Sequence, residues 1–492
     1  MSRPATLPEL KAHFGERFRW LLLLAVMVGT MASIMSSTVI NVAVPEMSRH
    51  FALDQARAQW VSSGFMVAMT VSMLTTPWLL ARHGYRATYA ATMWLMLAGG
   101  VVGGLTDHYP LVLAARVAEG LAAGVVQPIP AIIIMRAFEP HEQGRASGIF
   151  GMGVVLAPAI GPSIGGLLVD WFGWRSIFFM VVPFCLLSLW LGHRFVPTTA
   201  PGGQAADSTE RLDWPGLLLA SAGTLCLLNG LVHWHADTWL TAAVLLGLAL
   251  LALLAFLARE RRLGQQFMRH ADTLKPLLNP ALFKHRPFAM GSLVAFIYGM
   301  ALFGSTYLLP VFMQSGLNLS PSFVGTILLP AGIILAATIA LAGRLADRYP
   351  AHWLICLGLV LLAASFALMA TVTLTASLGL LVSWAILGRV GLGFILPSLN
   401  LGAMRGVSGP MIPQGASAIN FVRMLGGAVG VSLCGIVLEW RLAAHGDSLA
   451  IAQSSPARLA AFDEVFLLLA GLCALAVLAA WRLRHAPTES AE

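Results

Sequence analysis

Apolar runs of about 20 residues recur along the whole chain, and they constrain its fold more than any other feature, because a run of that length spans a bilayer as one helix. The runs cover residues 19–43, 58–80, 88–106, 110–135, 146–169, 175–193, 214–233, 238–258, 287–309, 320–343, 351–374, 378–402, 414–438 and 463–481. The sequence therefore predicts an all-α membrane protein with about fourteen transmembrane helices.

The composition agrees with a chain whose solvent is mostly lipid. Of its 492 residues, 58% are hydrophobic and 11% are charged, whereas soluble globular proteins carry roughly 25% charged residues. The five cysteines show no metal-ligand spacing, so we expect no metal and no cofactor. Zinc-protease and phosphate-loop motifs are also missing from the sequence, and we do not expect an enzyme.

Basic residues indicate the orientation in the membrane. With both termini in the cytoplasm, 22 of the 30 Lys and Arg residues lie on the inner side, as the positive-inside rule requires. The net charge of +8 is then a consequence of topology. A basic run after residue 258 is expected to anchor the chain at the anionic leaflet, and no nucleic-acid partner is expected.

The two ends of the chain repeat each other weakly. RVAEGLAAG from Arg116 matches RVGLGFILP from Arg389, and LLARHGYR matches GRLADRYP. A duplicated six-helix unit explains both pairs. We expect an N-terminal six-helix bundle over 1–195, a cytoplasmic linker rich in Pro, Gly and Ser over 196–213, two inserted transmembrane helices over 214–260, a basic cytoplasmic loop over 261–286, and a C-terminal six-helix bundle over 287–492.

The fifth run carries the most specific motif. Its small residues recur every four positions, a spacing that lets a second helix approach closely. The stretch resembles the antiporter signature of major facilitator transporters, with Gly153, Pro158, Gly161, Pro162, Gly165 and Gly166 in the matching positions. Two six-helix halves with two inserted helices are what the resemblance implies for the fold, with a substrate site near mid-membrane.

Further stretches are similar to the 14-span drug/proton antiporters of the EmrB/QacA type. They are STVINVAVP from residue 37, YLLPVFMQSGLNLSPSFVGTILLP from residue 307, and INFVRMLGGAVGVSL from residue 419. The resemblance implies proton-coupled efflux of lipophilic drugs across the inner membrane of a bacterium by alternating access. Relatives of this type in double-membrane bacteria work with a periplasmic adaptor and an outer-membrane channel, a partnership that no residue of this chain demonstrates.

The cytoplasmic gate motif departs from the family pattern GxLaDRxGRR. PWLLARHGYR keeps Arg82, Gly84 and Arg86 but has Pro77 and Ala81 in place of the Gly and Asp. The second copy keeps a Gly, an Asp and an Arg, namely Gly343, Asp347 and Arg348. We expect a weaker latch under the first half, and ordinary positive-inside charge is the alternative explanation.

Glu119 is the one carboxylate predicted deep within a membrane helix. The resembled family usually has an acid at the position of Ser36 and a Gln at the position of Glu119, so Glu119 is a candidate replacement for the first-span acid. Arg116 lies three residues earlier and shares a helix face with Glu119. Buried intramembrane charges pair or line a wet cavity. The pair is predicted to couple proton movement or bind substrate; recognition of a cation and a static packing role stay open.

Other polar and aromatic residues within the predicted spans are candidates for a substrate cavity. Interhelical hydrogen bonds or core packing are the alternatives for them. They are Asn41, Arg389, Asn420, Arg423, Phe296, Tyr298, Phe303 and Tyr307. The competing functions are export of one dedicated metabolite, fatty acid or siderophore, and a membrane sensor that does not transport.

Overall fold

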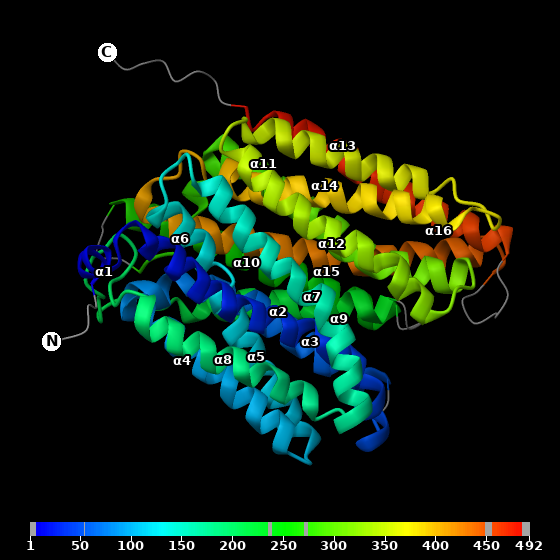
Figure 1. Cartoon of the computed structure of the whole chain (residues 1–492), viewed down its shortest axis with the longest axis horizontal. Coiled ribbons are helices and arrows are strands. Elements are labelled where there is room, and N and C mark those ends of the chain that lie inside the picture. Colours follow the sequence, from blue (N-terminus) through cyan, green and yellow to red (C-terminus); the bar gives the residue numbers. More distant parts are fainter. Residues whose placement is uncertain (1–5, 54, 235–238, 270–273, 448–454, 485–492) are drawn as a thin grey trace. The chain divides into compact units, whose positions relative to one another are not determined.

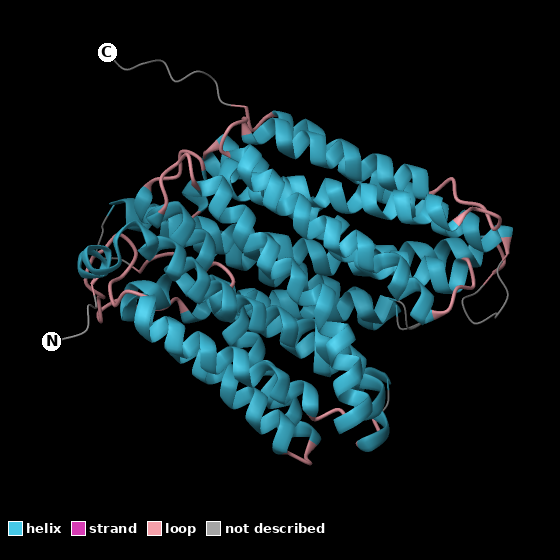
Figure 2. Ribbon diagram, viewed as in Figure 1, coloured by secondary structure: helices cyan, strands magenta, loops and turns pink. Residues whose placement is uncertain are grey.

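The computed structural model describes residues 6–53, 55–234, 239–269, 274–447 and 455–484. Within these ranges every regular element is a helix (Figure 2). The first helices in chain order are α1 (Leu7–Phe14), η1 (Gly15–Arg17), α2 (Phe18–His50), α3 (Gln55–Ser72), η2 (Met73–Thr75), α4 (Thr76–Leu105), α5 (Tyr109–Val126), α6 (Ile129–Ala137), α7 (Gln143–Phe172), α8 (Ser176–Phe195), α9 (Trp214–Trp234) and α10 (Trp239–Arg269).

The remaining helices continue this series to the end of the chain's described part (Figure 1). They are η3 (Pro280–Lys284), α11 (Arg286–Val311), η4 (Phe312–Gly316), α12 (Pro321–Ala346), α13 (Ala351–Met369), α14 (Leu378–Met404), η5 (Gly409–Met411), α15 (Ile412–Ala444) and α16 (Pro456–Trp481). Each apolar run predicted as a span falls on one or more of these helices, so the all-α prediction is confirmed.

Among the described residues, twelve helical ranges are long and apolar enough to cross a membrane. One of them, Trp60–Leu105, contains two predicted spans. The chain turns between them at Gly84, whose φ of 76° and ψ of 174° interrupt α4. A side chain rarely adopts that conformation. The 30-residue α7 is a further long helix beyond those ranges.

The predicted span over 110–135 is divided. The structure ends α5 at Val126 and starts α6 at Ile129. Pro128 and Pro130 lie at this junction, and proline lacks the N–H that would continue a helix hydrogen-bond ladder. The hydropathy of the segment is unbroken, so length and composition alone predict one helix here.

Two compact units make up the chain. Unit 1 comprises residues 1–224, 252–281 and 407–421, and unit 2 comprises residues 225–251, 282–406 and 422–492. In unit 1, α5 packs against α3 and α4, α2 packs against α7, and α8 packs against α2 and α4. In unit 2, α14 packs against α12 and α13, and α16 packs against α13. The division into bundles, linker and inserted helices stays a prediction.

The antiporter motif forms the contact between α7 and α2. Gly161 and Gly165 face Val39, and Gly153 faces the sulfur of Met27. A Cβ atom added at Gly161 would lie 2.9 Å from a methyl carbon of Val39. Small residues are therefore required for this approach. The side chains of Pro158 and Pro162 lie outside the described part of the structure; Gly166 lies beside Val42 on the same contact.

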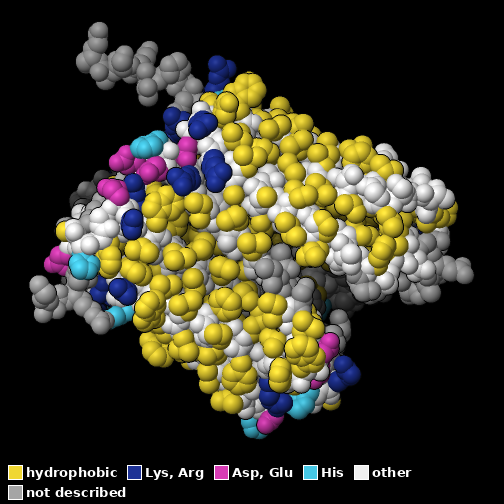
Figure 3. All heavy atoms as spheres, viewed as in Figure 1, with side chains coloured by type: hydrophobic (Ala, Val, Ile, Leu, Met, Phe, Trp, Pro, Cys, Tyr) yellow, Lys and Arg dark blue, Asp and Glu magenta, His cyan; other side chains and the backbone are white. Residues whose placement is uncertain are grey.

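Large apolar side chains are exposed on the long helices. Trp171, Leu218, Trp239 and Leu475 are each at least 63% exposed. Figure 3 shows hydrophobic side chains over much of the visible face, with charged ones gathered near its margins. A soluble monomer rarely exposes contiguous apolar surface on this scale. The protein is therefore a multi-pass integral membrane protein.

Candidate functional site

An ion pair lies completely inside unit 1. Arg116 Nη1 donates to Glu119 Oε2 over 2.6 Å, and both residues are at most 2% exposed. Ser36 of α2 joins them, because its Oγ accepts from Arg116 Nη1 at 2.8 Å and donates to Glu119 Oε2 at 3.1 Å. Ser36 stands where the resemblance places an acid. The structure thus puts that position in direct contact with the acid of α5.

The arginine is held on its other sides by α3. Its Nε donates to the Val61 carbonyl over 3.3 Å, and its guanidinium carbon lies 4.3 Å from the centre of the Phe65 ring. A desolvated cation over an aromatic face contributes roughly 2 kcal/mol. Arg116 is therefore positioned by three helices, whereas the sequence predicted only its spacing to Glu119.

Close helix packing explains why these partners meet. Gly120 of α5 lies against the Phe65 backbone, and Gly124 lies against Met69 and Ser72 of α3. On the α4 side, a Cβ atom at Gly99 would come within 2.7 Å of the Glu119 side chain. Only glycine at these positions lets α5 approach both neighbours closely. The glycines of EGLAAG therefore shape the site.

Two atoms of the pair keep unused hydrogen-bonding capacity. Within the described structure, Glu119 Oε1 and Arg116 Nη2 are buried and have no hydrogen-bond partner. A buried unsatisfied polar group costs about 1–3 kcal/mol, and more when it is charged. Such an atom in a native protein requires an explanation, and a catalytic or binding role is a common one. Glu119 Oε1 can accept a proton, or it can accept a hydrogen bond from a donor group of a substrate.

The first gate turn is held by the linker. Tyr85 N donates to the Thr199 carbonyl at 3.0 Å, and Arg86 N donates to the Pro197 carbonyl at 2.9 Å. A Cβ atom at Gly84 would collide with the Thr198 carbonyl. The segment predicted as a cytoplasmic linker is thus hydrogen-bonded to the turn at residues 81–86.

The gate arginines use linker carbonyls as acceptors. Arg82 Nη1 donates to the Glu210 carbonyl at 2.5 Å, and Arg86 Nε donates to the Val196 carbonyl at 2.7 Å. Asp207 caps this part of the linker by accepting hydrogen bonds from Thr209, which lower the pKa of Asp207. The linker thus supplies backbone acceptors to both arginines of a turn that has Ala81 at the motif's acidic position.

The second gate copy is built differently. Gly343 is buried within α12, Asp347 follows the last residue of that helix, and Arg348 is exposed. The Arg348 N–H bonds to the Leu345 carbonyl at 3.0 Å, which closes the helix end locally. The weaker latch predicted for the first half stays a prediction.

Two of the cavity candidates of unit 2 lie near Tyr298. This tyrosine of α11 is 2% exposed and interacts electrostatically with Arg389 of α14 and Arg423 of α15, which are both half-buried. Phe303 packs its ring against Gly427 of α15. Three aromatic residues of α11 are partly exposed; they are Phe296, Phe303 and Tyr307.

The two candidate asparagines have different surroundings. Asn41 of α2 is exposed, and its Oδ1 accepts from Ser62 Oγ of α3 over 3.0 Å. Asn420 is buried, and its Nδ2 donates to the Ala416 carbonyl of its own helix over 2.8 Å. The roles of both as cavity residues stay predictions.

Sequence reasoning missed two buried acids near the helices after the linker. Asp213 and Glu260 are both fully buried. Arg259 forms a two-pronged pair with Asp213, and Glu260 Oε2 accepts from Leu278 N at 3.0 Å. The apolar runs begin at residue 214 and end at residue 258, so neither acid lies within a predicted span. The longer amphipathic end of α10 was the available signal.

A family model decides the identity of the fold. The model of the Major Facilitator Superfamily matches residues 26–219 and 214–431. The chain belongs to this superfamily. As a member of this superfamily, it is a membrane transporter.

Individual superfamily relatives are distant but cover most of the chain. A multidrug resistance protein B homolog of Mycobacterium tuberculosis is 27% identical over 436 residues, which are 87% of this chain and 78% of the relative. The riboflavin transporter RibZ of Clostridioides difficile is 26% identical, covering 84% of this chain and 87% of the relative. The solved proton:xylose symporter XylE is 12% identical with a TM-score of 0.66, covering 94% of each chain, and shows the fold alone.

Proposed function

We propose that this transporter exports lipophilic compounds in exchange for protons and that Glu119 carries the proton. One observation supports this most directly: a fully buried carboxylate is shared by an arginine and a serine and keeps one oxygen without a hydrogen-bond partner in the described structure. The multidrug-resistance name of one relative supports the direction and the substrate class.

The cluster has the chemistry for a reversible proton step. A charged Glu119 is neutralised by Arg116, and a protonated Glu119 would leave the guanidinium with Ser36, the Val61 carbonyl and the Phe65 ring as partners. Arg116 is therefore never left without polar neighbours. The carboxyl group gains a proton from one side of the membrane and returns it to the other, and no covalent bond to the substrate forms.

The test uses the full chain in proteoliposomes with an imposed pH gradient and a panel of cationic and anionic dyes. Glu119→Gln keeps the size and hydrogen bonding of the side chain but cannot release a proton, so dye-coupled proton movement should fall to the level of empty vesicles. Dye exchange without a gradient should persist, which shows that the variant folds and binds. Unchanged coupling in Glu119→Gln rejects the proposal, and loss for cationic dyes alone assigns Glu119 to substrate recognition.

A second candidate is a transporter dedicated to one metabolite. The similarity to a riboflavin transporter favours it, because the two chains match over most of their length. Expression of this protein in a drug-sensitive bacterium separates the two functions. Resistance to several unrelated compounds supports multidrug export, whereas resistance to none, together with transport of a single metabolite in vesicles, supports the dedicated transporter.

A further inference from the structure

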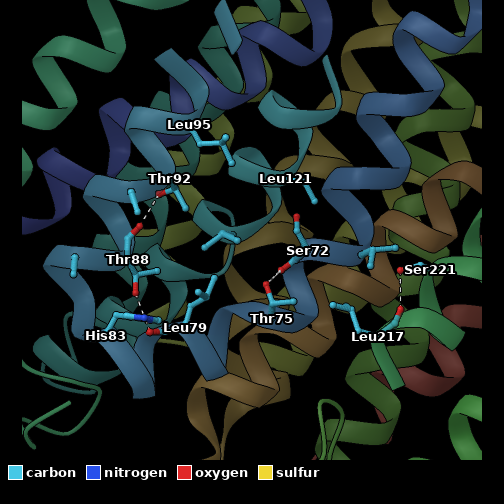
Figure 4. A pocket seen from close by; sticks show the side chains of 14 residues that line it. Ser72, Thr75, Leu79, His83, Thr88, Thr92, Leu95, Leu121, Leu217 and Ser221 are labelled. Atoms are coloured by element: carbon cyan, nitrogen blue, oxygen red, sulfur yellow. Dashed lines mark hydrogen bonds between the residues drawn. The ribbon is translucent and has the colours of Figure 1, made fainter. Parts of the chain in front are cut away.

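A groove of about 530 Å³ lies in unit 1, and neither Arg116 nor Glu119 lines it. Residues of α3, η2, α4, α5 and α9 line it (Figure 4). They are Val71, Ser72, Thr75, Leu79, His83, Ala87, Thr88, Ala91, Thr92, Leu95, Leu121, Val125, Leu217 and Ser221. Its volume is that of a small-molecule site, within the usual range of about 300–1,000 Å³.

The lining offers apolar contact and little else. Its hydroxyl groups are bonded to carbonyl groups of neighbouring turns, as Figure 4 shows for Thr92 on Thr88 and for Ser221 on Leu217. Thr75 Oγ1 likewise donates to the Ser72 carbonyl over 2.7 Å. With the hydroxyl donors used in this way, a polar substrate finds few partners there.

The shape of the groove follows from one face of α4. Ala87, Ala91 and Leu95 recur every four residues, and the two alanines are exposed along the floor. Eight residues of helix rise by about 12 Å. One leaflet of the hydrocarbon core is about 15 Å thick, half of the roughly 30 Å core. The stretch of α4 that lines the groove from Ala87 to Leu95 therefore covers most of the thickness of one leaflet.

One end of the groove is polar. His83 is exposed there and is the single ionisable residue of the lining. Its ring lies 6.0 Å from that of Trp78, next to the turn at Gly84 that joins two predicted spans. Tryptophan is enriched at the membrane–water boundary. The polar end thus lies at the level expected for lipid headgroups, and the apolar remainder extends into the leaflet.

We propose that this groove is a binding site for one acyl chain of a membrane phospholipid, seated between α4 and the inserted helix α9. The occupant is a lipid because the α4 lining covers most of a leaflet, the walls are apolar, and the interfacial end is polar. Leu95 and Leu121 at its sides are 39% and 41% exposed, so the site is continuous with the surface that faces lipid. The site gives α9 a lipid-filled contact with the first bundle.

The experiment places the purified full chain in vesicles of phosphatidylethanolamine and phosphatidylglycerol. A trace of phosphatidylethanolamine with a diazirine in one acyl chain is the probe. After illumination, adducts are mapped by peptide mass spectrometry. Ala91→Phe fills the floor of the groove, and Ala98→Phe makes the same change at an exposed position of α4 outside the lining. Ala87→Leu is a milder filling variant if Ala91→Phe fails to fold.

We expect adducts on peptides containing residues 71–95 and 217–221 in the unaltered chain and in Ala98→Phe. Loss of most of these adducts in Ala91→Phe or Ala87→Leu supports the proposal. Equal labelling in all variants overturns it, since the lipid would then only coat the surface. Displacement of the label by ethidium also overturns it, because the groove would then take a lipophilic substrate instead of a lipid.

Discussion

Helices α5 and α14 carry two similar sequence stretches, and they differ at the position that holds Glu119 in α5. Arg116 and Arg389 begin the copies, but three residues later α5 has Glu119 and α14 has Leu392, which is 1% exposed. One copy therefore holds a buried ion pair, and the other holds an arginine near Tyr298. The corresponding residues Glu119 and Leu392 are therefore both buried, but one carries a carboxyl group and the other is apolar.

The gate turns differ in a parallel way. The turn at Gly84 has lost the acid of the motif and is bound by linker carbonyls, whereas the turn after α12 keeps Asp347. In both comparisons one stretch has an acidic side chain, Glu119 or Asp347, and the other stretch has an apolar residue at that position.

The largest expected effect is the difference in stability between the variants Arg116→Ala and Arg389→Ala. Arg116→Ala leaves the buried Glu119 without its cation, and breaking a buried pair destabilises a protein by about 3–5 kcal/mol. Arg389→Ala removes a cation next to a leucine and should change the unfolding temperature much less. Thermal unfolding in detergent measures both, and equal losses would contradict the assigned difference between α5 and α14.

Moving the acid from position 119 to position 36 tests whether proton coupling requires a carboxylate at position 119 itself. Ser36 Oγ lies 2.8 Å from Arg116 Nη1, so an aspartate at position 36 would face the same guanidinium. The double variant Ser36→Asp with Glu119→Gln should regain part of the proton coupling that Glu119→Gln loses. Dye transport under a pH gradient is the measurement, with Ser36→Asn in the same background as the control. If the double variant regains no coupling, the proton step requires the acid at position 119.

Loss of the contact between Gly84 and the linker should destabilise the protein less than loss of the ion pair. Gly84→Ala forces a side chain into a positive-φ conformation and against the Thr198 carbonyl, and such strain costs of order 1–3 kcal/mol. Gly406 also has positive φ, at 79°, but has open space around it. Gly406→Ala is therefore the matched control with the smaller loss. If both variants unfold at the same temperature, the linker does not constrain the turn.

Ser36→Ala should have the smallest effect. It removes hydrogen bonds to Arg116 and Glu119 but leaves their direct 2.6 Å contact. A typical hydrogen bond contributes about 1 kcal/mol net, so loss of the two bonds should weaken coupling by roughly five- to thirtyfold. Initial rates of dye-coupled proton movement test this. A complete loss would make Ser36 an obligatory part of the proton step.

Local sequence determined the helices and the membrane setting. Apolar runs of sufficient length leave few alternatives in lipid, because backbone groups must be satisfied within each helix. The i, i+3 pairing of Arg116 with Glu119 was also readable, since helix geometry fixes that spacing. The same reasoning predicted the small-residue face of α7, although the pattern did not say that Val39 of α2 would cover it.

Tertiary structure decided which distant groups complete each site. Ser36 and Val61 reach Arg116 from helices 80 and 55 residues away in the chain, and the linker returns to the turn at Gly84 from more than 100 residues away. These contacts depend on how closely helices approach, which glycines at positions 99, 120 and 124 permit. Sequence alone carries the spacing within a helix, but the partners across helices follow from packing.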